Sequence, residues 1–424
     1  MTAIRWRLLI TACVIAIAAF LIVKSNKNNV CTTFEDYYSD RDKNPNCYYN
    51  PDHELEVPDI ARRHGYPIEI YNVTTSDGYI LTVFRIPHGR LSNKTSKKPL
   101  FLQHGITLNA GSFLIIGKKS LGFMLADAGY DVWLGNFRGS RYSNNHTHLD
   151  HRSESYWNFS FHENGVFDLD AQINLISTVT RRKIIYVGFS MGTTAAYIYF
   201  STYPDQDKLK FFVGLAPVTY VEDVWVMKVL VRPWTLVAGF VQRLTHGRMY
   251  PRPFMPFYLY KLICFPYPFQ IKMCQMIDML IMGLNYEEND PETLPVSLLY
   301  NSDAVSVNTF WHFYQLVHAN KFQYFDYGES GNLEKYNKST PPLYDLSKVN
   351  VENHLFYAEN DKLAPVKNVK RLFGDLPKTH IHKLYQVKDE RFNHIDFVSG
   401  KNADRLVYRP VINLLNAIKE AENP

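Results

Sequence analysis

The segment Gly188-Phe189-Ser190-Met191-Gly192 has the pattern G-x-S-x-G, which is typical of a nucleophilic serine in a tight turn. The residues before it, Lys183–Val187, predict a buried strand, and Met191–Tyr203 predicts a helix that ends at Pro204. At such a junction the serine backbone is strained, and the two glycines leave out the Cβ atoms that would clash. We therefore predict that Ser190 is a nucleophile; the alternative is a serine that only caps the helix.

A serine needs a base to react, and the base needs an acid that orients it. In enzymes with this kind of turn, the acid and then the histidine follow the serine along the chain. Asp361 comes just after the strand-like run His354–Tyr357, and His394 just after the run Lys383–Val387. Because both positions lie at carboxyl ends of strands, we predict Asp361 as the acid and His394 as the base.

Other residues of the same types compete for these roles. His380 and His382 precede the last predicted strand and should lie at its wrong end. Asp345 also precedes its strand, and Asp396 is too close to His394 in the sequence to be the first choice.

Acyl transfer also needs donors for the oxygen that becomes negatively charged. Met191 opens the predicted helix, so its backbone N–H has no partner within that helix. The second donor should follow an early strand, which favours the N–H of Ile106 in the loop Gln103-His104-Gly105-Ile106. His104 resembles a catalytic base, but its place before a glycine in this loop favours a structural role.

The elements that must position these residues alternate along the chain. Glu69–Thr74 and Tyr79–Ile86 predict a hairpin around Ser76-Asp77-Gly78, and Leu406 to about Ala421 predicts a final helix. Further short apolar runs predict buried strands at Pro99–Gln103, Asp131–Leu134, Lys183–Val187 and Phe211–Leu215. Two later runs are strand-like, namely His354–Tyr357 and Lys383–Val387. Short buried strands separated by helices favour a mostly parallel sheet with helices on both faces.

Residues 218–340 interrupt this alternation and are rich in aromatic residues and methionine. We predict that they form a largely helical cap over the active site. The cap would be inserted between a first core segment at 30–217, which begins with an N-terminal arm, and a second at 341–424. The alternative is an additional core layer without contact to the substrate.

Residues 1–29 are predicted to lie outside the fold. Basic residues flank the apolar run 8–23, a pattern of a signal peptide or signal anchor. The run is shorter than the roughly 20 residues that cross a bilayer comfortably, so we favour cleavage, with a membrane tether as the alternative. The folded part is expected in the secretory pathway, either secreted, lysosomal or tethered with the enzyme domain on the lumenal or extracellular side.

Cysteine and asparagine patterns agree with that compartment. Apart from Cys13 in the apolar run, the cysteines form pairs close in sequence, which predicts the disulfides Cys31–Cys47 and Cys264–Cys274, with buried free thiols as the alternative. The triplet N-x-S/T predicts glycosylation at Asn72, Asn93, Asn145, Asn158 and Asn337.

The composition excludes several classes of protein. With 46% hydrophobic and 21% charged residues the chain is globular rather than disordered or fibrous. Its net charge of +5 comes from scattered Lys and Arg, which disfavours nucleic acid as a partner. No HExxH, P-loop or dinucleotide motif is present, and serine chemistry needs no metal or organic cofactor.

The sequence resembles the acid lipase family of α/β-hydrolases, which includes gastric and lysosomal acid lipases. The resemblance extends from about residue 45 to residue 420. The first matching stretches are His64-Gly65-Tyr66-Pro67, Asp77-Gly78-Tyr79-Ile80-Leu81, Arg85-Ile86-Pro87-His88-Gly89-Arg90, Leu102-Gln103-His104-Gly105 and Leu125 to Asn136, followed by Arg138-Gly139. The later ones are Phe161-His162-Glu163, Gly188 to Thr194, Lys321-Phe322-Gln323, Asn360-Asp361 and Asn393-His394-Ile395-Asp396-Phe397.

The resemblance implies the α/β-hydrolase fold, a triad of Ser190, Asp361 and His394, and oxyanion donors at Ile106 and Met191. It also implies hydrolysis of lipid esters such as triacylglycerol or sterol esters, at a lipid–water interface and through an acyl-enzyme. The aromatic cap suits a fatty acyl chain. Two alternatives are a hydrolase of short soluble esters and a catalytically idle lipid-binding protein, which the complete triad disfavours.

Two stretches depart from the usual pattern of the family. His and Gln commonly flank the nucleophile, whereas this chain has Phe189 and Met191. The contact at position 191 is made by the backbone, so the oxyanion donor is retained, while the more apolar rim bears on substrate preference. An apolar pair and Ala-Asp-Pro often follow Asn360-Asp361, where this chain has Lys362-Leu363-Ala364-Pro365. The cap is the least similar region, so the resemblance says least about the substrate.

Overall fold

The computed structural model describes residues 29–422, apart from 93–95, 97, 204, 232–238, 241, 250–267 and 301–302. Its centre is a nine-stranded sheet with the order β13-β12-β9-β8-β5-β6-β4-β3, and β7 pairs with β4. The strands are β3 (Glu69–Thr74), β4 (Tyr79–Ile86), β5 (Pro99–Gln103), β6 (Asp131–Leu134), β7 (Asn145–His146), β8 (Ile184–Phe189), β9 (Leu209–Leu215), β12 (Asn353–Tyr357) and β13 (His382–Gln386).

The sheet is mostly parallel, as predicted. Every neighbouring pair from β13 to β6 is parallel, whereas β4 pairs antiparallel with β6, β3 and β7. Every residue of β5, β8 and β12 is buried, which explains why these strands are continuous apolar runs in the sequence. β8 extends two residues beyond the predicted run because Gly188 and Phe189 still pair with Gly214 and Leu215 of β9.

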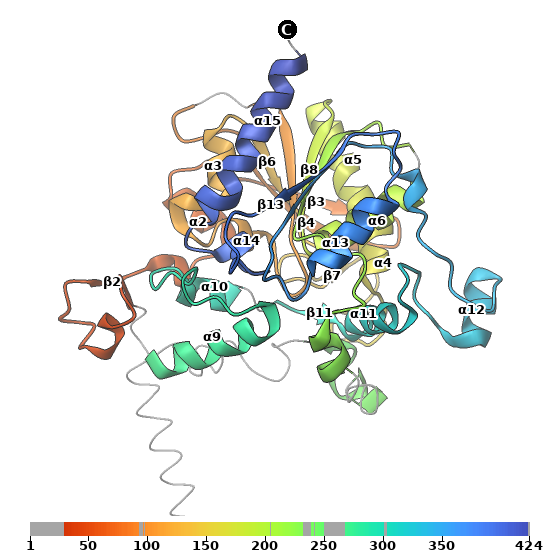
Figure 1. The fold of residues 1–424 in the computed structure, drawn as a ribbon, viewed down its shortest axis with the longest axis horizontal. Helices are drawn as coiled ribbons and strands as arrows, with labels where there is room; N and C mark the ends of the chain where they lie inside the picture. The colour runs from red at the N-terminus through yellow and green to blue at the C-terminus, as the bar shows by residue number, and fades with distance from the viewer. Residues whose placement is uncertain are drawn as a thin grey trace, which may run out of the picture.

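Helices cover both faces of the sheet (Figure 1). One face carries α3 (Leu121–Asp127) and α15 (Arg409–Glu422), and the other carries α5 (Leu169–Thr180), α6 (Met191–Thr202) and α13 (Val366–Asp375). The remaining short helices of the core are α2 (Val57–Arg63), α4 (Phe161–Glu163) and α14 (Asp396–Ser399). A π-helical turn at Asp404–Tyr408 precedes α15, so the predicted final helix begins with a wider turn.

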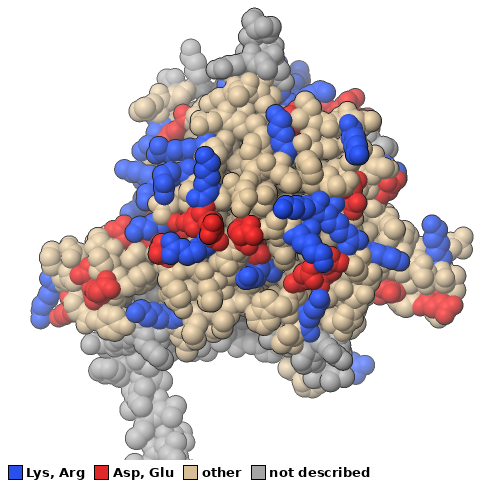
Figure 2. Space-filling model, viewed as in Figure 1, with Lys and Arg blue, Asp and Glu red and all other residues tan. Residues whose placement is uncertain are grey.

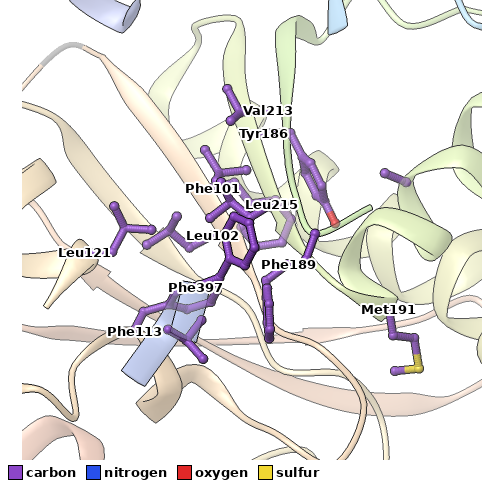
Figure 3. Close-up of a cluster of buried hydrophobic side chains, with 14 of the residues drawn as sticks. Phe101, Leu102, Phe113, Leu121, Tyr186, Phe189, Met191, Val213, Leu215 and Phe397 are labelled. Atoms are coloured by element: carbon purple, nitrogen blue, oxygen red, sulfur yellow. The ribbon is translucent and has the colours of Figure 1, made fainter. Parts of the chain in front are cut away.

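The core beneath the turn that carries Ser190 is apolar and closely packed. Figure 3 shows a cluster to which the strands contribute Phe101 and Leu102 from β5, Tyr186 and Phe189 from β8, and Val213 and Leu215 from β9. All of these side chains are buried. Their packing anchors the carboxyl end of β8 and therefore the turn that follows it.

Between β9 and β12 the described residues add no strand to the central sheet. They form α9 (Pro268–Met282), α10 (Leu294–Tyr300), α11 (Val307–Ala319), α12 (Gly328–Tyr336) and a π-helical turn at Met227–Val231. They also form a pair of short strands, β10 (Arg248–Met249) and β11 (Val305–Ser306), which the sequence did not predict. Figure 1 shows α9 to α12 at one end of the sheet.

The predicted secretory features fall partly within the described residues. The Cys31–Cys47 disulfide is confirmed and joins β1 (Asn29–Cys31) to β2 (Cys47–Tyr49). Cys274 is disulfide-bonded, but its predicted partner Cys264 lies outside the described residues, as do Asn93 and the apolar run 8–23. The remaining predicted glycosylation sites are exposed, namely Asn72, Asn145, Asn158 and Asn337.

Within residues 29–422 as described, no helix is long and apolar enough to cross a membrane. The surface charge is mixed. On the face shown in Figure 2, acidic side chains lie between groups of Lys and Arg.

Arg138 forms a buried charged cluster that ties the β3–β4 hairpin to the helical layer. The side chain is almost completely buried, and its Nε donates to Asp168 at 2.7 Å. Its terminal nitrogens donate to Asp77 in the hairpin turn at 2.6 and 2.9 Å, and its guanidinium carbon lies 3.9 Å from the centre of the Tyr79 ring. The arginine is therefore the counter-charge for two carboxylates.

Replacing Arg138 with methionine is expected to lower the free energy of unfolding by about 3–5 kcal/mol, because Asp168 would stay buried without a counter-charge. Denaturant unfolding of the purified variant measures this loss. Arg62→Met is the matched control, because the Arg62–Asp59 pair is exposed and its removal should cost no more than about 1 kcal/mol. A similar small loss for Arg138→Met would show that the buried cluster is not important for stability.

Candidate active site

Ser190 lies in the turn between β8 and α6 with φ 53° and ψ −120°, a conformation that a non-glycine residue rarely adopts. Gly188 and Gly192 are required because there is no room for a side chain at either position. A Cβ on Gly188 would lie 2.9 Å from the backbone of Gly192, and a Cβ on Gly192 would lie 2.5 Å from the carbonyl oxygen of Gln103. The turn is thus as tight as the G-x-S-x-G pattern predicts.

The fold brings the three predicted triad residues together. His394 Nε2 lies 2.7 Å from Ser190 Oγ, and His394 Nδ1 lies 2.8 Å from Asp361 Oδ2. All three side chains are buried. The other oxygen of Asp361 accepts the backbone N–H groups of Leu363 and Ala364 at 2.9 and 2.7 Å. This arrangement favours the tautomer in which Nδ1–H donates to Asp361 and Nε2 accepts the serine proton.

The competing residues lie elsewhere or have other partners. His382 begins β13, at the opposite end of the strand from His394, and its Nε2 faces the carbonyl oxygen of Pro377 at 2.8 Å. Asp345 caps the turn Leu346–Lys348. Asp396 accepts the backbone N–H of Asn393 at 2.8 Å, and burial raises its pKa to about 8. It therefore supports the histidine loop rather than the imidazole.

The two predicted oxyanion donors flank the serine. Ile106 lies in the loop after β5, Met191 is the first residue of α6, and within the described chain neither N–H donates to a protein group. The two loops are in close contact, because a Cβ on Gly105 would lie 2.9 Å from the Cβ of Ser190. The site therefore has two free amide donors beside its serine.

His104 holds the oxyanion loop in place. Its Nδ1 donates to the carbonyl oxygen of Gly105 at 2.8 Å, and its Nε2 accepts the N–H of Phe137 at 3.1 Å. Burial lowers the pKa of His104 to about 4, so the ring is neutral near neutral pH and can fill both roles. The ring bonds backbone groups of two loops rather than the serine, as expected for a structural residue.

A carboxylate of the predicted cap also supports this loop, and no sequence pattern indicates it. Asp303 is buried, and its N–H donates to the carbonyl oxygen of Thr107 at 2.7 Å. Its carboxylate accepts the Asn109 side chain at 2.8 Å and the Arg141 backbone N–H at 2.9 Å. The oxyanion loop is therefore bonded to residues outside the sheet domain.

The end of α9 contacts the loops of both the acid and the histidine. The carbonyl oxygen of Met282 accepts the N–H of Lys362 at 3.2 Å and that of His394 at 3.4 Å. The next residue, Gly283, has φ 125°, and its carbonyl oxygen accepts the Asn393 side chain at 2.8 Å. The turn at the end of α9 thus spaces the two loops that carry Asp361 and His394.

Gly283→Ala is expected to lower kcat/KM about 100-fold, because a displacement of about 1 Å among catalytic groups has effects of that size. Its Cβ would lie 2.1 Å from the carbonyl oxygen of Asn360, so the acid loop would have to move. Gly374→Ala in α13 is the control, since nothing lies within 4 Å of its Cβ and activity should be retained. Steady-state kinetics on a soluble ester measures kcat/KM for both variants. An unchanged kcat/KM for Gly283→Ala would refute the spacing role.

Above the serine lies a small cavity of about 40 Å³, enclosed by the oxyanion loop, the triad loops and α9. Its lining is mostly apolar and includes Phe189, Met282, Leu363 and Ile395. Asp278 of α9 is the one carboxyl group among the lining residues, and burial raises its pKa to about 7. Asp278 was not predicted as a site residue, because an acidic residue on a predicted helix has no distinctive pattern.

The arrangement has the parts required for acyl transfer. A serine hydroxyl contacts a histidine base, an acid orients that base, and two free amide donors lie beside the serine. Among the described residues, no group of His, Cys, Asp or Glu is arranged to hold a metal ion.

Residues 98–400 match the family model described as alpha/beta hydrolase fold, and residues 57–117 match the model described as partial alpha/beta-hydrolase lipase region. Gastric triacylglycerol lipase of Bos taurus is 36% identical over 374 residues, covering 86% of this chain and 92% of that protein. Lipase member K of Homo sapiens is 35% identical over 373 residues, with the same shares covered.

Among solved structures, a hypothetical protein from Pseudomonas aeruginosa has a TM-score of 0.51 at 11% identity. The match covers 83% of this chain and 94% of that one, and it shows the fold alone.

Proposed function

The chain belongs to the α/β-hydrolase lipases, the family of the gastric triacylglycerol lipases, and we propose that it cleaves long-chain acyl esters of glycerol or sterols at Ser190. It is a carboxylic ester hydrolase. The contact of His394 with both Ser190 and Asp361 is the observation that carries the proposal about the nucleophile.

In the proposed reaction, His394 takes the proton of Ser190 as Oγ attacks the ester carbonyl, and Asp361 stabilises the imidazolium. The N–H groups of Ile106 and Met191 bind the oxyanion, each contributing about 3–4 kcal/mol. His394 then protonates the departing alcohol. Water, activated by the same histidine, hydrolyses the acyl-enzyme and restores the serine.

The outer face of α9 supports action at a lipid–water interface. A surface helix usually turns its polar residues outward, whereas α9 and the turn after it expose apolar side chains. These exposed residues are Met276, Ile277, Leu280, Leu284 and Tyr286. The cavity of about 40 Å³ has room for only a few atoms, so a long acyl chain requires the cap to move. Contact of this face with lipid would favour such a movement.

The proposed place of action is the secretory pathway, in the extracellular space or the lysosome. The disulfide between Cys31 and Cys47 and the exposed glycosylation triplets support an oxidising compartment. A tether through residues 8–23 would hold the enzyme at a membrane. That segment lies outside the described residues.

The experiment that tests the proposal compares one acyl ester series in two physical states. Protein made by secretory expression would be assayed on emulsions of triacylglycerol and cholesteryl ester and on dissolved short-chain esters, at acidic and neutral pH. We expect long-chain emulsions to be hydrolysed and the rate on a sparingly soluble ester to rise when droplets form. Hydrolysis confined to dissolved short-chain esters would contradict the lipase proposal and leave a soluble-ester hydrolase.

A further inference from the structure

The inner face of α9 carries two polar side chains that have no hydrogen-bond partner among the described residues. Gln275 and Asp278 are one helical turn apart and therefore share a face. Gln275 is only 3% exposed, and no described residue hydrogen-bonds its side chain or that of Asp278. Asp278 is partly buried. Polar groups withdrawn from bulk water are stabilised by hydrogen bonds, which a small polar ligand in this place would supply.

Both side chains line one recess beneath α9. Amide and hydroxyl groups provide most of the remaining lining, from Asn289, Ser297, Asn393 and Ser399. The recess has a volume of about 20 Å³, which is the space of one water molecule or one hydroxyl group. Its chemistry suits a small neutral polar group rather than an acyl chain.

The recess adjoins the catalytic cavity on the side of the histidine. The two cavities share Asp278 and Ile395, and Asn393 and Ile395 flank His394 in the chain. The alcohol part of an ester must lie on this side, because His394 has to protonate its oxygen as it leaves. A substituent on that alcohol would therefore point toward Gln275 and Asp278.

We propose that Gln275 and Asp278 form a subsite for a free hydroxyl group on the alcohol part of the substrate, so that the enzyme prefers partial glycerides to esters of apolar alcohols. This inference rests on the proposed function. A hydroxyl group both donates and accepts, and the amide of Gln275 and the carboxyl of Asp278 complement it in either protonation state of the acid. Burial raises the pKa of Asp278 to about 7, so below that pH its carboxyl can also donate.

The test compares monooleoylglycerol with ethyl oleate in the same detergent micelles, because the two esters share the acyl chain and differ in free hydroxyl groups. We expect the double variant Gln275→Leu/Asp278→Leu to lower the ratio of their kcat/KM values about tenfold. The value for ethyl oleate should fall less than the value for monooleoylglycerol, because ethyl oleate has no hydroxyl group for the subsite to bind. Asp278→Asn should keep the preference, and Met279→Leu, which changes an apolar residue of the same lining, is the matched control.

Thermal unfolding of the double variant should occur at an unchanged or higher temperature, because no hydrogen bond to a described residue is lost. An unchanged substrate ratio would overturn the subsite. An equal loss on both esters would overturn it as well, because it would indicate a structural role. If wild type hydrolysed neither ester, the proposed function itself would fail and this inference with it.

Discussion

Replacing Ser190 with alanine is expected to lower kcat on every ester by about 10⁶-fold while leaving the fold intact. The loss follows from the geometry, because Ser190 Oγ is the group that His394 Nε2 contacts at 2.7 Å, and the described lining of the cavity contains no second serine and no cysteine. Alanine keeps the Cβ that the turn already accommodates at φ 53°, so the backbone need not change. Initial rates and thermal unfolding of the purified variant, measured side by side, separate loss of chemistry from loss of structure.

A second serine of the same helix provides the control. Ser201 lies near the end of α6, is buried, and bonds the N–H of Asp345 rather than a catalytic group. Ser201→Ala should keep its kcat and its labelling by a fluorophosphonate, whereas Ser190→Ala should lose both. Substantial turnover by folded Ser190→Ala would place the nucleophile elsewhere.

The central strands were predictable because one physical pattern dominates them. A strand buried on both faces needs a continuous apolar run, and β5 and β6 begin and end at the predicted residues. The end of β8 was harder to predict from the sequence, because a glycine normally indicates a turn. Gly188 nevertheless stays in the ladder, since the neighbouring strand β9 offers Gly214 as its partner.

The meeting of the three proposed triad residues was predictable for a related reason. Asp361 follows the buried strand β12 and His394 follows the edge strand β13, and the carboxyl ends of parallel strands converge at one edge of the sheet. Position in the chain therefore implies position in space, without knowledge of any side-chain contact.

No such rule predicts the supporting residues between β9 and β12. Gly283 follows an apolar helix and resembles an ordinary glycine at a helix end, although its importance comes from the carbonyl oxygen of Asn360, far along the chain. Gln275 and Asp278 resemble the solvated face of a surface helix. The structure instead turns that face inward and the apolar face outward, and this reversal depends on how α9 rests on the triad loops.

Asp361→Asn is expected to lower kcat about 10⁴-fold, which is the size of effect seen when a triad histidine takes the wrong tautomer. The N–H groups of Leu363 and Ala364 require an oxygen at the position of Asp361 Oδ1. The asparagine must therefore place its NH₂ group toward His394 Nδ1, 2.8 Å away in the wild type. His394 Nδ1 would then accept a hydrogen bond rather than donate one. Nε2 would carry the proton and point it toward Ser190, so the ring could not act as a base.

Asp396→Asn is the control for Asp361→Asn. It tests whether the loss of any carboxylate near the histidine loop lowers kcat, or only the loss of the one that sets the tautomer of His394. Asp396 Oδ2 accepts the Asn393 N–H and the Asn285 side chain, and an asparagine oxygen at the same position can accept both. Its raised pKa of about 8 means that the native side chain is already neutral near pH 7, so the substitution changes little charge. Steady-state kinetics should show kcat within about tenfold of wild type for Asp396→Asn, since its hydrogen bonds can be retained. A loss equal to that of Asp361→Asn would mean that the loop tolerates neither change and would remove the tautomer argument.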